Sequence, residues 1–321
     1  MEESRPAETP PPVRFKADLA IVDAVRQALA DGAAWLWYYD AAARRGDSEG
    51  VHQFRVTVRR LRAAIELAAP ILHGARLRYY RTELPVMGHC AGAVRDCDVM
   101  SELLHEHANA LDPVNARALM PAFQALADHR MATMRAMIAL LNSPRYRRLT
   151  TRLAPPLTRK VPPETTTRII APTLLKPLIG SARRAGARLR RDSTPPVFHR
   201  LRVRLKRVRY AFELIDEIGG KRTAKTVKRL RRLQDELGEH QDLVNTSIWL
   251  RDFAKYPALP PETLVATGAL IQFIGERRVE VAGRAFKRWR KFARGAFLAA
   301  AQDEIAHAAR QAVIAPAVAL A

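Results

Sequence analysis

Two segments of the chain place a histidine, three basic residues and a glutamate at identical spacing. Residues 51–67 read VHQFRVTVRRLRAAIEL and residues 198–214 read FHRLRVRLKRVRYAFEL, so each member of the second set follows its counterpart by 147 residues. Arginine and lysine bind phosphate oxygens, and histidine can donate a hydrogen bond or exchange a proton near neutral pH. The pattern therefore offers anion binding, with acid–base catalysis by the histidines as the alternative. The two sets are His52, Arg55, Arg59, Arg62 and Glu66, and His199, Arg202, Lys206, Arg209 and Glu213.

The spacing predicts that each set lies along one face of an amphipathic helix. At about 100° per residue, the five positions of a set fall within an arc of roughly 80°, opposite a separate apolar arc. A charged row can be no more than a solvated face. Here, however, each row of like charges has only one carboxylate, whereas a face built for solubility mixes the two signs. We interpret the rows as a binding face for an anion. The apolar arcs are Phe54, Val58, Leu61 and Ile65, and Leu201, Leu205, Val208 and Phe212.

The composition also indicates an anionic partner. The 321 residues carry a formal net charge of +22, which is typical of proteins that bind polyanions. The charge is uneven: residues 1–150 hold 20 basic and 17 acidic residues, a net of +3, whereas residues 151–321 hold 34 and 15, a net of +19. We expect the second half to dominate long-range attraction.

Cysteine usage and hydropathy bear on the compartment. The two cysteines, Cys90 and Cys97, argue against a disulfide scaffold and fit a reducing cytoplasm. The N-terminus lacks the pattern of a secretory signal, and no apolar run approaches the length of a transmembrane helix. The apolar C-terminal segment AVIAPAVALA could dock on the core or on a hydrophobic surface such as that of a granule, and docking on the core is favoured.

Helical patterning predicts an all-α fold of two similar helical bundles. Residues 1–15 are predicted to be disordered, residues 16–153 to form the first repeat, residues 154–167 a connector rich in proline and threonine, and residues 168–321 the second repeat. Further landmarks recur in the same order in both halves, which favours an internal duplication. They are Gly92, Arg95 and Asp96 with Gly238, Gln241 and Asp242, and Tyr146 with Trp289.

Other basic rows could extend the anion-binding face if their helices pack beside the two rows above. The alternative is that each is a separate solvated face. The candidates are Lys221, Lys225, Lys228 and Arg232 on one predicted helix, and Arg288 and Lys291 on a later one.

The sequence offers little for catalysis or metal binding. The cysteines and histidines lack a closed set of four ligand positions, and we expect Asp96 and Asp242 to brace a helix junction rather than to bind a metal. No Walker A loop, GxGxxG fingerprint or GxSxG elbow occurs. We therefore expect no enzymatic activity, no metal and no cofactor.

The repeated pattern H-x-x-R-V-x-x-[R/K]-R-x-R, at residues 52–62 and 199–209, resembles the CHAD family, the conserved histidine α-helical domain. The Gly-x-x-x-Asp landmarks at Gly92–Asp96 and Gly238–Asp242 support the resemblance, which covers roughly residues 17–310. One departure is Gln241, which stands where the first half has Arg95.

The resemblance implies two pseudo-symmetric helical bundles around a basic cavity that binds inorganic polyphosphate, and association with polyphosphate granules. Some family members are fused to a triphosphate tunnel domain, whose ExExK signature this chain lacks. Two rival functions remain. A nucleic-acid-binding protein would need stacking aromatics, for which Tyr210 and Trp289 are the main candidates. A phosphohydrolase would use the histidines. The binding residues that the resemblance implies are His52, Arg55, Arg59, Arg62, His199, Arg202, Lys206 and Arg209.

Overall fold

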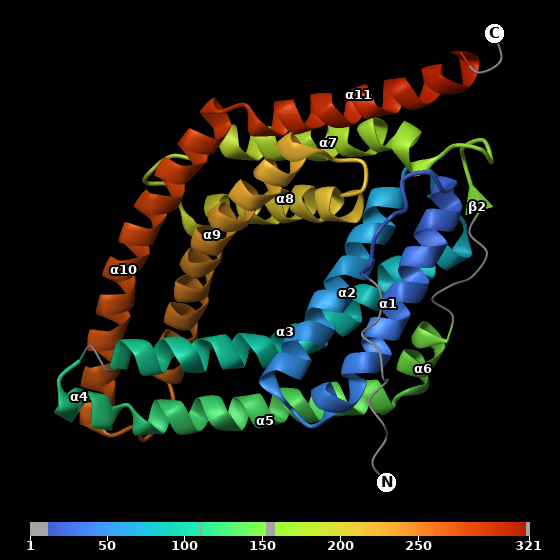
Figure 1. Cartoon of the computed structure of the whole chain (residues 1–321). Helices are drawn as coiled ribbons and strands as arrows, with labels where there is room; N and C mark the ends of the chain where they lie inside the picture. Colours follow the sequence, from blue (N-terminus) through green and yellow to red (C-terminus); the bar gives the residue numbers. More distant parts are fainter. Residues whose placement is uncertain (1–11, 109–110, 152–157, 319–321) are drawn as a thin grey trace.

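The computed structural model describes residues 12–108, 111–151 and 158–318, and in this part of the chain the fold is all-α (Figure 1). Helical periodicity therefore predicted the fold class correctly. The exception is a two-residue antiparallel pair in which Leu72 faces Arg159. The elements are α1 (Ile21–Arg44), α2 (Ser48–Ala68), β1 (Leu72–His73), α3 (Ala75–Ala108), α4 (Pro113–Ala118), α5 (Met120–Asn142), α6 (Pro144–Thr150), β2 (Thr158–Arg159), α7 (Thr167–Ala187), α8 (Pro195–Leu214), α9 (Lys221–Phe253), α10 (Pro261–Arg294) and α11 (Phe297–Val318).

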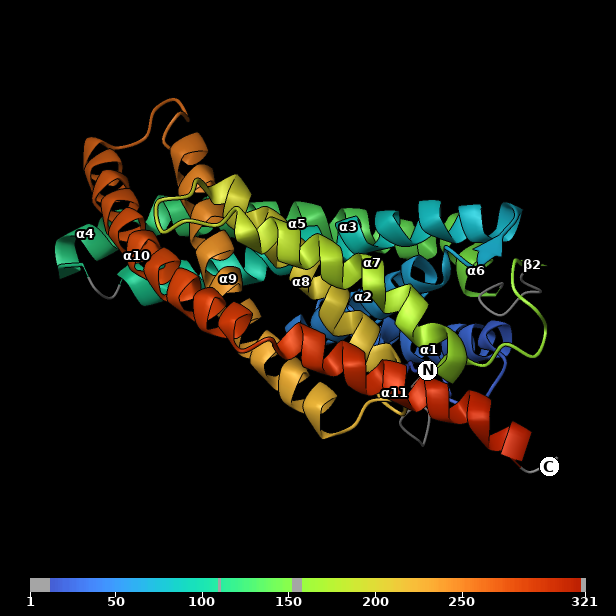
Figure 2. The same cartoon turned by 90° about the horizontal axis from the view of Figure 1, so that it is seen from above.

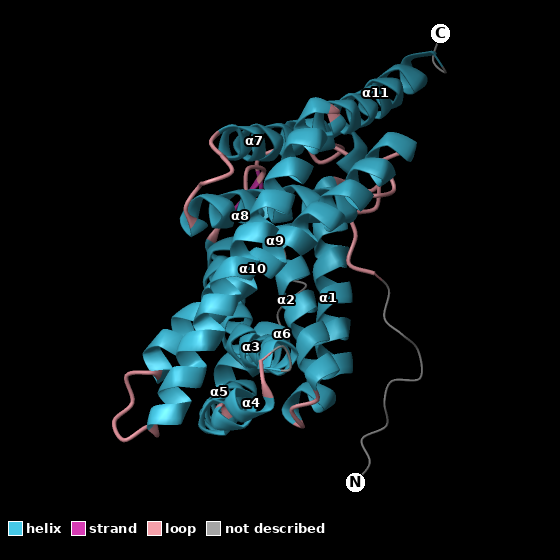
Figure 3. Cartoon of the chain, turned by 90° about the vertical axis from the view of Figure 1, so that its left-hand side faces the viewer, coloured by secondary structure: helices cyan, strands magenta, loops and turns pink. Residues whose placement is uncertain are grey.

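The helices pack in two groups that meet at two places. In the N-terminal group α2 lies between α1 and α3, and α5 lies along α3. In the C-terminal group α8 lies between α7 and α9, α10 runs antiparallel to α9, and α11 lies along α7 (Figures 1 and 2). The groups meet where α2 contacts α8, and again where α3 and α4 contact α10. Figure 3 shows the second junction from the side. The internal duplication stays a prediction.

Two apolar clusters correspond to these two junctions. The larger cluster takes in α1, α2, α7, α8 and the N-terminal part of α9. The smaller one joins α3 and α5 to α9 and α10 through residues such as Cys97, Leu126, Leu250 and Leu270. Side chains of both α2 and α8 belong to the larger cluster, so the contact between the two helices is part of the core. Apolar burial of this kind is the main source of stability. None of the described helices combines the length and the apolar character needed to cross a membrane.

The helices α2 and α8 form for local reasons. The carboxylate of Asp47 accepts hydrogen bonds from the backbone N–H groups of Glu49 and Gly50 and so caps the start of α2. Pro195 and Pro196 occupy the first turn of α8, where a missing N–H costs nothing. The predicted apolar arcs are buried, with exposed fractions of 0–1% for all eight side chains. The predicted amphipathic faces are thus confirmed.

The residues just before α1 also belong to the core. Residues 1–11 of the predicted N-terminal tail lie outside the described residues, but Val13 and Phe15 are buried. The backbone N–H of Phe15 donates to the carbonyl of Leu214 at 2.6 Å, and Lys16 pairs with Glu217 at 2.8 Å. The end of the tail therefore packs against the C-terminal end of α8.

Candidate anion-binding site

The basic faces of α2 and α8 come together where the two helices pack. We call the five cations that meet there the central cluster: Arg55 and Arg59 on α2, and Arg202, Lys206 and Arg209 on α8. Arg55, Arg59, Arg202 and Arg209 all act electrostatically on Lys206, and Arg55 also acts on Arg202. Side chains that are 147 residues apart in sequence therefore share one site.

The central cluster has few partners among the described residues. Four of its arginines have a buried Nε–H that donates to no acceptor there: Arg55, Arg59, Arg202 and Arg209. Of the five cations, only Arg209 has a carboxylate oxygen within 4.0 Å in the described part of the chain, that of Glu213 at 3.9 Å. A buried polar group without a partner is costly, and a buried unpaired charge more so. An anion from outside would satisfy these groups.

Burial and mutual repulsion change the proton affinity of the cluster. Loss of hydration, and then the neighbouring guanidinium groups, lower the pKa of Lys206 to about 6. The same causes lower the pKa of Arg59 to about 10, and burial lowers the pKa of Arg202. At neutral pH Lys206 is therefore mostly neutral.

Tyr210 holds two of the guanidinium groups in place. The guanidinium carbons of Arg59 and Arg209 lie 4.9 and 4.7 Å from the centroid of its ring, which is the geometry of cation–π contacts. An Nη2–H of Arg209 also donates to the Tyr210 hydroxyl at 2.8 Å. The attraction to the ring offsets part of the repulsion between the two cations, so the arginines are positioned before any ligand arrives.

The two aromatic residues considered for stacking on nucleic acid bases are both buried. Tyr210 is 5% exposed and carries the two guanidinium groups. Trp289 is 6% exposed, and its indole N–H donates to the carbonyl of Gly186 at 2.9 Å. Trp289 also fits against Gly186 so closely that a Cβ there would lie 1.8 Å from the ring. Both rings are packing residues, so neither offers an exposed face for stacking on a base.

Two carboxylates, those of Asp96 and Asp242, lie near the cluster. Asp242 on α9 is the first of the charged groups that raise the pKa of Arg202, and Asp96 on α3 acts in the same direction. Burial raises the pKa of Asp242, while Arg202 opposes that change. The two carboxylates therefore favour the charged form of Arg202, although neither forms an ion pair with it among the described residues.

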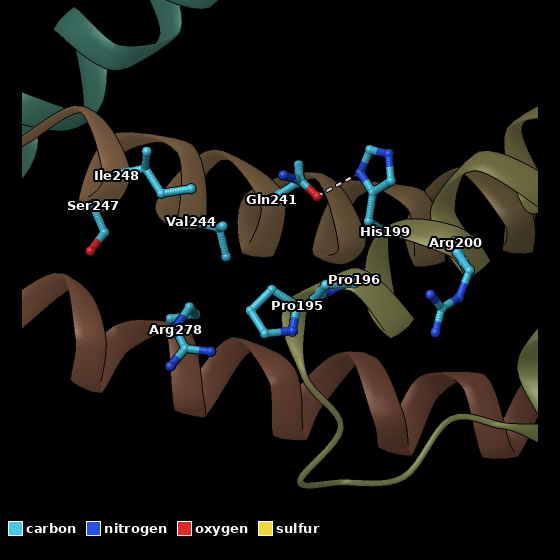
Figure 4. Close-up of a pocket in the computed structure, with 9 residues that line it drawn as sticks. All are labelled: Pro195, Pro196, His199, Arg200, Gln241, Val244, Ser247, Ile248 and Arg278. Carbon is cyan, nitrogen blue, oxygen red and sulfur yellow. Dashed lines mark hydrogen bonds between the residues drawn. The ribbon is translucent and has the colours of Figure 1, made fainter. Parts of the chain in front are cut away.

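The two histidines differ because of the one departure in the repeated pattern. His199 is exposed, and its Nδ1 lies 2.7 Å from the amide oxygen of Gln241 (Figure 4), so the ring donates there and Nε2 is left for a ligand. His52 faces Arg95, the counterpart of Gln241, and has a buried Nδ1 with no partner. Burial, and then Arg95, lower the pKa of His52.

The remaining predicted residues lie outside the central cluster. Arg62 is exposed and lies near Glu66 and Arg207. Arg288 is paired with Glu236 at 2.5 Å, so its charge is already partly neutralised. The cations that most affect Arg59, Arg202 and Lys206 all come from α2 and α8. The other basic residues form an exposed surface on α9 and α10, which we call the outer row: Lys221, Lys225, Lys228, Arg232 and Lys291.

A shallow cavity of about 640 Å³ lies beside His199, between α8, α9 and α10 (Figure 4). Pro195, Val244 and Ile248 contribute its apolar lining, and Arg200 and Arg278 contribute charge. Neither arginine was predicted as a site residue. Arg200 follows the histidine of the motif directly and so lies off the row that the helical spacing selected, and Arg278 approaches only through tertiary packing.

Comparison with known proteins identifies the family. The family model for the CHAD domain matches residues 27–251, which include both basic rows. This chain belongs to the CHAD domain family. The resemblance inferred from the two histidine motifs is thereby confirmed.

Two solved structures share the fold. The CHAD domain from the plant Ricinus communis superposes with a TM-score of 0.69 and 27% identity, covering 87% of this chain and 96% of that one. PptA from Streptomyces chartreusis, at 19% identity, has a TM-score of 0.69 and covers 84% and 98%. A curated relative, the uncharacterized protein MT2285 of Mycobacterium tuberculosis (strain CDC 1551 / Oshkosh), is 24% identical over 231 residues. The matched part is 69% of this chain but only 44% of that relative.

Proposed function

We propose that this CHAD protein binds inorganic polyphosphate without hydrolysing it. The observation that carries the proposal is the central cluster, in which four buried arginine Nε atoms from two helices lack partners among the described residues and surround Lys206. Polyphosphate carries about one negative charge per phosphate and has no side groups, so a narrow chain can reach cations at the bottom of a junction between helices. Arginine forks and a lysine are suited to its oxygens.

Two rival functions have weaker support. Nucleic acid would need exposed aromatic rings beside the cations, and Tyr210 and Trp289 are buried. A hydrolase that used His199 as a base would benefit from a carboxylate on the second ring nitrogen, but the partner there is the amide of Gln241. A neutral amide orients the ring but brings no negative charge to it.

The proposal is tested by titrating the protein with polyphosphate of defined length, single- and double-stranded DNA, and inositol hexakisphosphate, each at two salt concentrations. We expect polyphosphate to bind most tightly at equal charge, with affinity falling steeply as salt rises, because bound polyanions release counterions. Preferential retention of DNA at matched salt would favour the nucleic-acid alternative. Release of orthophosphate in the presence of Mg²⁺ or Mn²⁺ would favour the hydrolase.

The first prediction concerns charge reversal within the central cluster. Replacing Arg202, Lys206 and Arg209 together by Glu should reduce polyphosphate affinity by at least 100-fold, because three favourable contacts become repulsive. The matched control replaces by Glu three exposed cations that do not act on Arg59, Arg202 or Lys206, namely Arg135, Lys176 and Arg310. Circular dichroism verifies folding of both variants. Equal losses in the two variants would mean that net charge, and not the cluster, determines binding.

We further propose that polyphosphate binding directs the protein to polyphosphate granules in the cytoplasm. Fluorescently tagged protein should co-localise with granules in cells that accumulate polyphosphate. The triple Glu variant of α8 should be diffuse, and the control variant should not. Granule association of the triple variant would require another anchor.

A further inference from the structure

The two helices that form the central cluster differ at one position of the motif, and the difference affects whether the side chain there can lose a proton. Arg59 on α2 corresponds to Lys206 on α8 in the repeated motif. A guanidinium stays protonated at any physiological pH, whereas an ammonium can lose its proton when it is buried or crowded by other cations. At this position of the motif, α8 thus carries a side chain that can lose its proton, Lys206, whereas α2 carries one that cannot, Arg59.

Lys206 is crowded by cations. Arg202 and Arg209 lie one helical turn before and after it on α8. From α2 it faces Arg55 and Arg59, and the guanidinium of Arg59 shares the Tyr210 ring with that of Arg209. From α9 the facing group is Asp242, on whose pKa Lys206 acts. The side of α7 that packs against α8 contributes apolar residues such as Leu175 and Ile179. Beyond these neighbours, Asp96 on α3 acts on Asp242 and Arg202, and His52 on α2 lies beside Arg55 and Arg59.

This arrangement disfavours a fifth positive charge in the empty site. Lys206 is only partly exposed, and no described residue forms an ion pair or a hydrogen bond with its Nζ. A phosphate chain that satisfies the arginines would bring several negative charges close to Nζ. The charged form of the lysine would then be favoured instead of the neutral form.

We propose that Lys206 takes up a proton when a phosphate chain enters the central cluster, so that polyanion binding to this protein is coupled to pH. The inference rests on the proposed function. In the coupled step the lone pair of Nζ accepts one proton from the solvent and the resulting ammonium pairs with phosphate oxygens; no other bond forms or breaks. Affinity then falls as the pH rises above neutrality, because the proton that accompanies binding becomes scarcer.

The number of protons taken up on binding depends on the pKa of Lys206 in the absence of ligand. Because burial and the neighbouring cations lower the pKa of Lys206 to about 6 in the absence of ligand, most of one proton should enter per site at pH 7. Affinity should decrease by up to about tenfold per pH unit between pH 7 and the raised pKa of the bound lysine, and should level off below pH 6.

The experiment is calorimetric titration of the full chain with long polyphosphate, in several buffers of different ionisation enthalpy at pH 7. The dependence of the measured enthalpy on the buffer gives the number of protons taken up. Long polyphosphate keeps the contribution of its titratable end groups small. The variants are Lys206→Arg, which fixes the charge, and Lys176→Arg, an exposed lysine on α7 that serves as the matched control. His52→Gln reports any proton taken up by the histidine in the cluster.

We expect wild type and Lys176→Arg to take up about one proton, and Lys206→Arg to bind while losing that uptake and most of the pH dependence between pH 7 and 8. The reciprocal variant Arg59→Lys should add uptake. Binding by wild type without proton uptake would overturn this inference and leave the proposed function intact. Uptake that survives in Lys206→Arg but disappears in His52→Gln would assign the proton to His52 and overturn the role of Lys206. Absence of binding by wild type would overturn the proposed function itself.

Discussion

At the scale of single residues, the central cluster lowers the stability of the fold. The cations of the central cluster repel each other, and the pKa of Lys206 falls to about 6 because burial and its neighbours disfavour the charged form. The unfolded chain would hold a proton on this lysine below its ordinary pKa of about 10.5, whereas the folded chain holds one only below about 6. The folded state is therefore progressively penalised as the pH falls from about 10 to about 6.

A second prediction follows for Lys206→Met, which keeps the aliphatic stem and removes the ionisable group. Without ligand the variant should be more stable than wild type at pH 7 by about 1 kcal/mol or more, about 2–4 °C in melting temperature, while its polyphosphate affinity decreases. The gain should shrink toward pH 10, where the wild-type lysine loses its penalty. Thermal melts at pH 6, 7, 8 and 10 measure this. Lower stability of the variant at every pH would show that the ammonium is satisfied within the fold.

At the scale of elements, α2 and α8 serve two purposes with two faces. The apolar face of each is completely buried, and the basic face meets that of the other helix. Precise placement of α2 depends on its start, where Asp47 caps the first turn, and on Gly50, where a Cβ would lie 2.6 Å from that of Ala42 on α1. The close approach of α1 positions the helix that carries Arg55 and Arg59.

The third prediction tests the cap of α2. Asp47→Ala removes the acceptor for two backbone N–H groups and should lower the free energy of unfolding by about 1 kcal/mol. Asp47→Asn retains an oxygen acceptor and should cost much less. Chemical denaturation of both variants gives the comparison. Equal destabilisation by Ala and Asn would indicate that the charge of Asp47, not its hydrogen bonds, supports the helix.

At the scale of the whole molecule, the central cluster is shared by the two halves, and the outer row belongs to the second half alone. The net charges of +3 and +19 for the two halves therefore do not describe the site. The charge of the second half is spread over exposed residues of α9 and α10, several of them paired, such as Arg284 with Glu239 at 2.7 Å. A long anion that fills the cluster could extend over the outer row.

The fourth prediction concerns the length of the bound chain. Replacing Lys221, Lys225 and Lys228 by Ala should weaken binding of long polyphosphate and reduce the slope of log affinity against log salt by about 2, since three fewer counterions are released. Chains of a few phosphates, which fill only the central cluster, should bind nearly as they do to wild type. Salt titrations with both lengths decide this. An equal loss for short chains would place the outer row within the primary site.

The sequence alone determined the parts of this protein that depend on local periodicity. The repeated His-Arg-Arg/Lys-Arg spacing predicted two helices with buried apolar arcs and a basic face, because the geometry of a helix is set by residues three and four apart. The family followed from the same residues. The helical class followed from the pattern of the whole chain.

Tertiary structure decided which of those cations share a site and in what state they are. Packing of α2 on α8 brings Arg59 and Lys206 together and places two guanidinium groups over Tyr210. Trp289 of α10 is buried against Gly186 of α7, and Arg288 pairs with Glu236. The spacing of residues within one helix does not reveal which side chains are buried by distant segments or which distant side chains they contact. The motif therefore identified the charges, and only the fold shows which are unpaired and why Lys206 is poised to accept a proton.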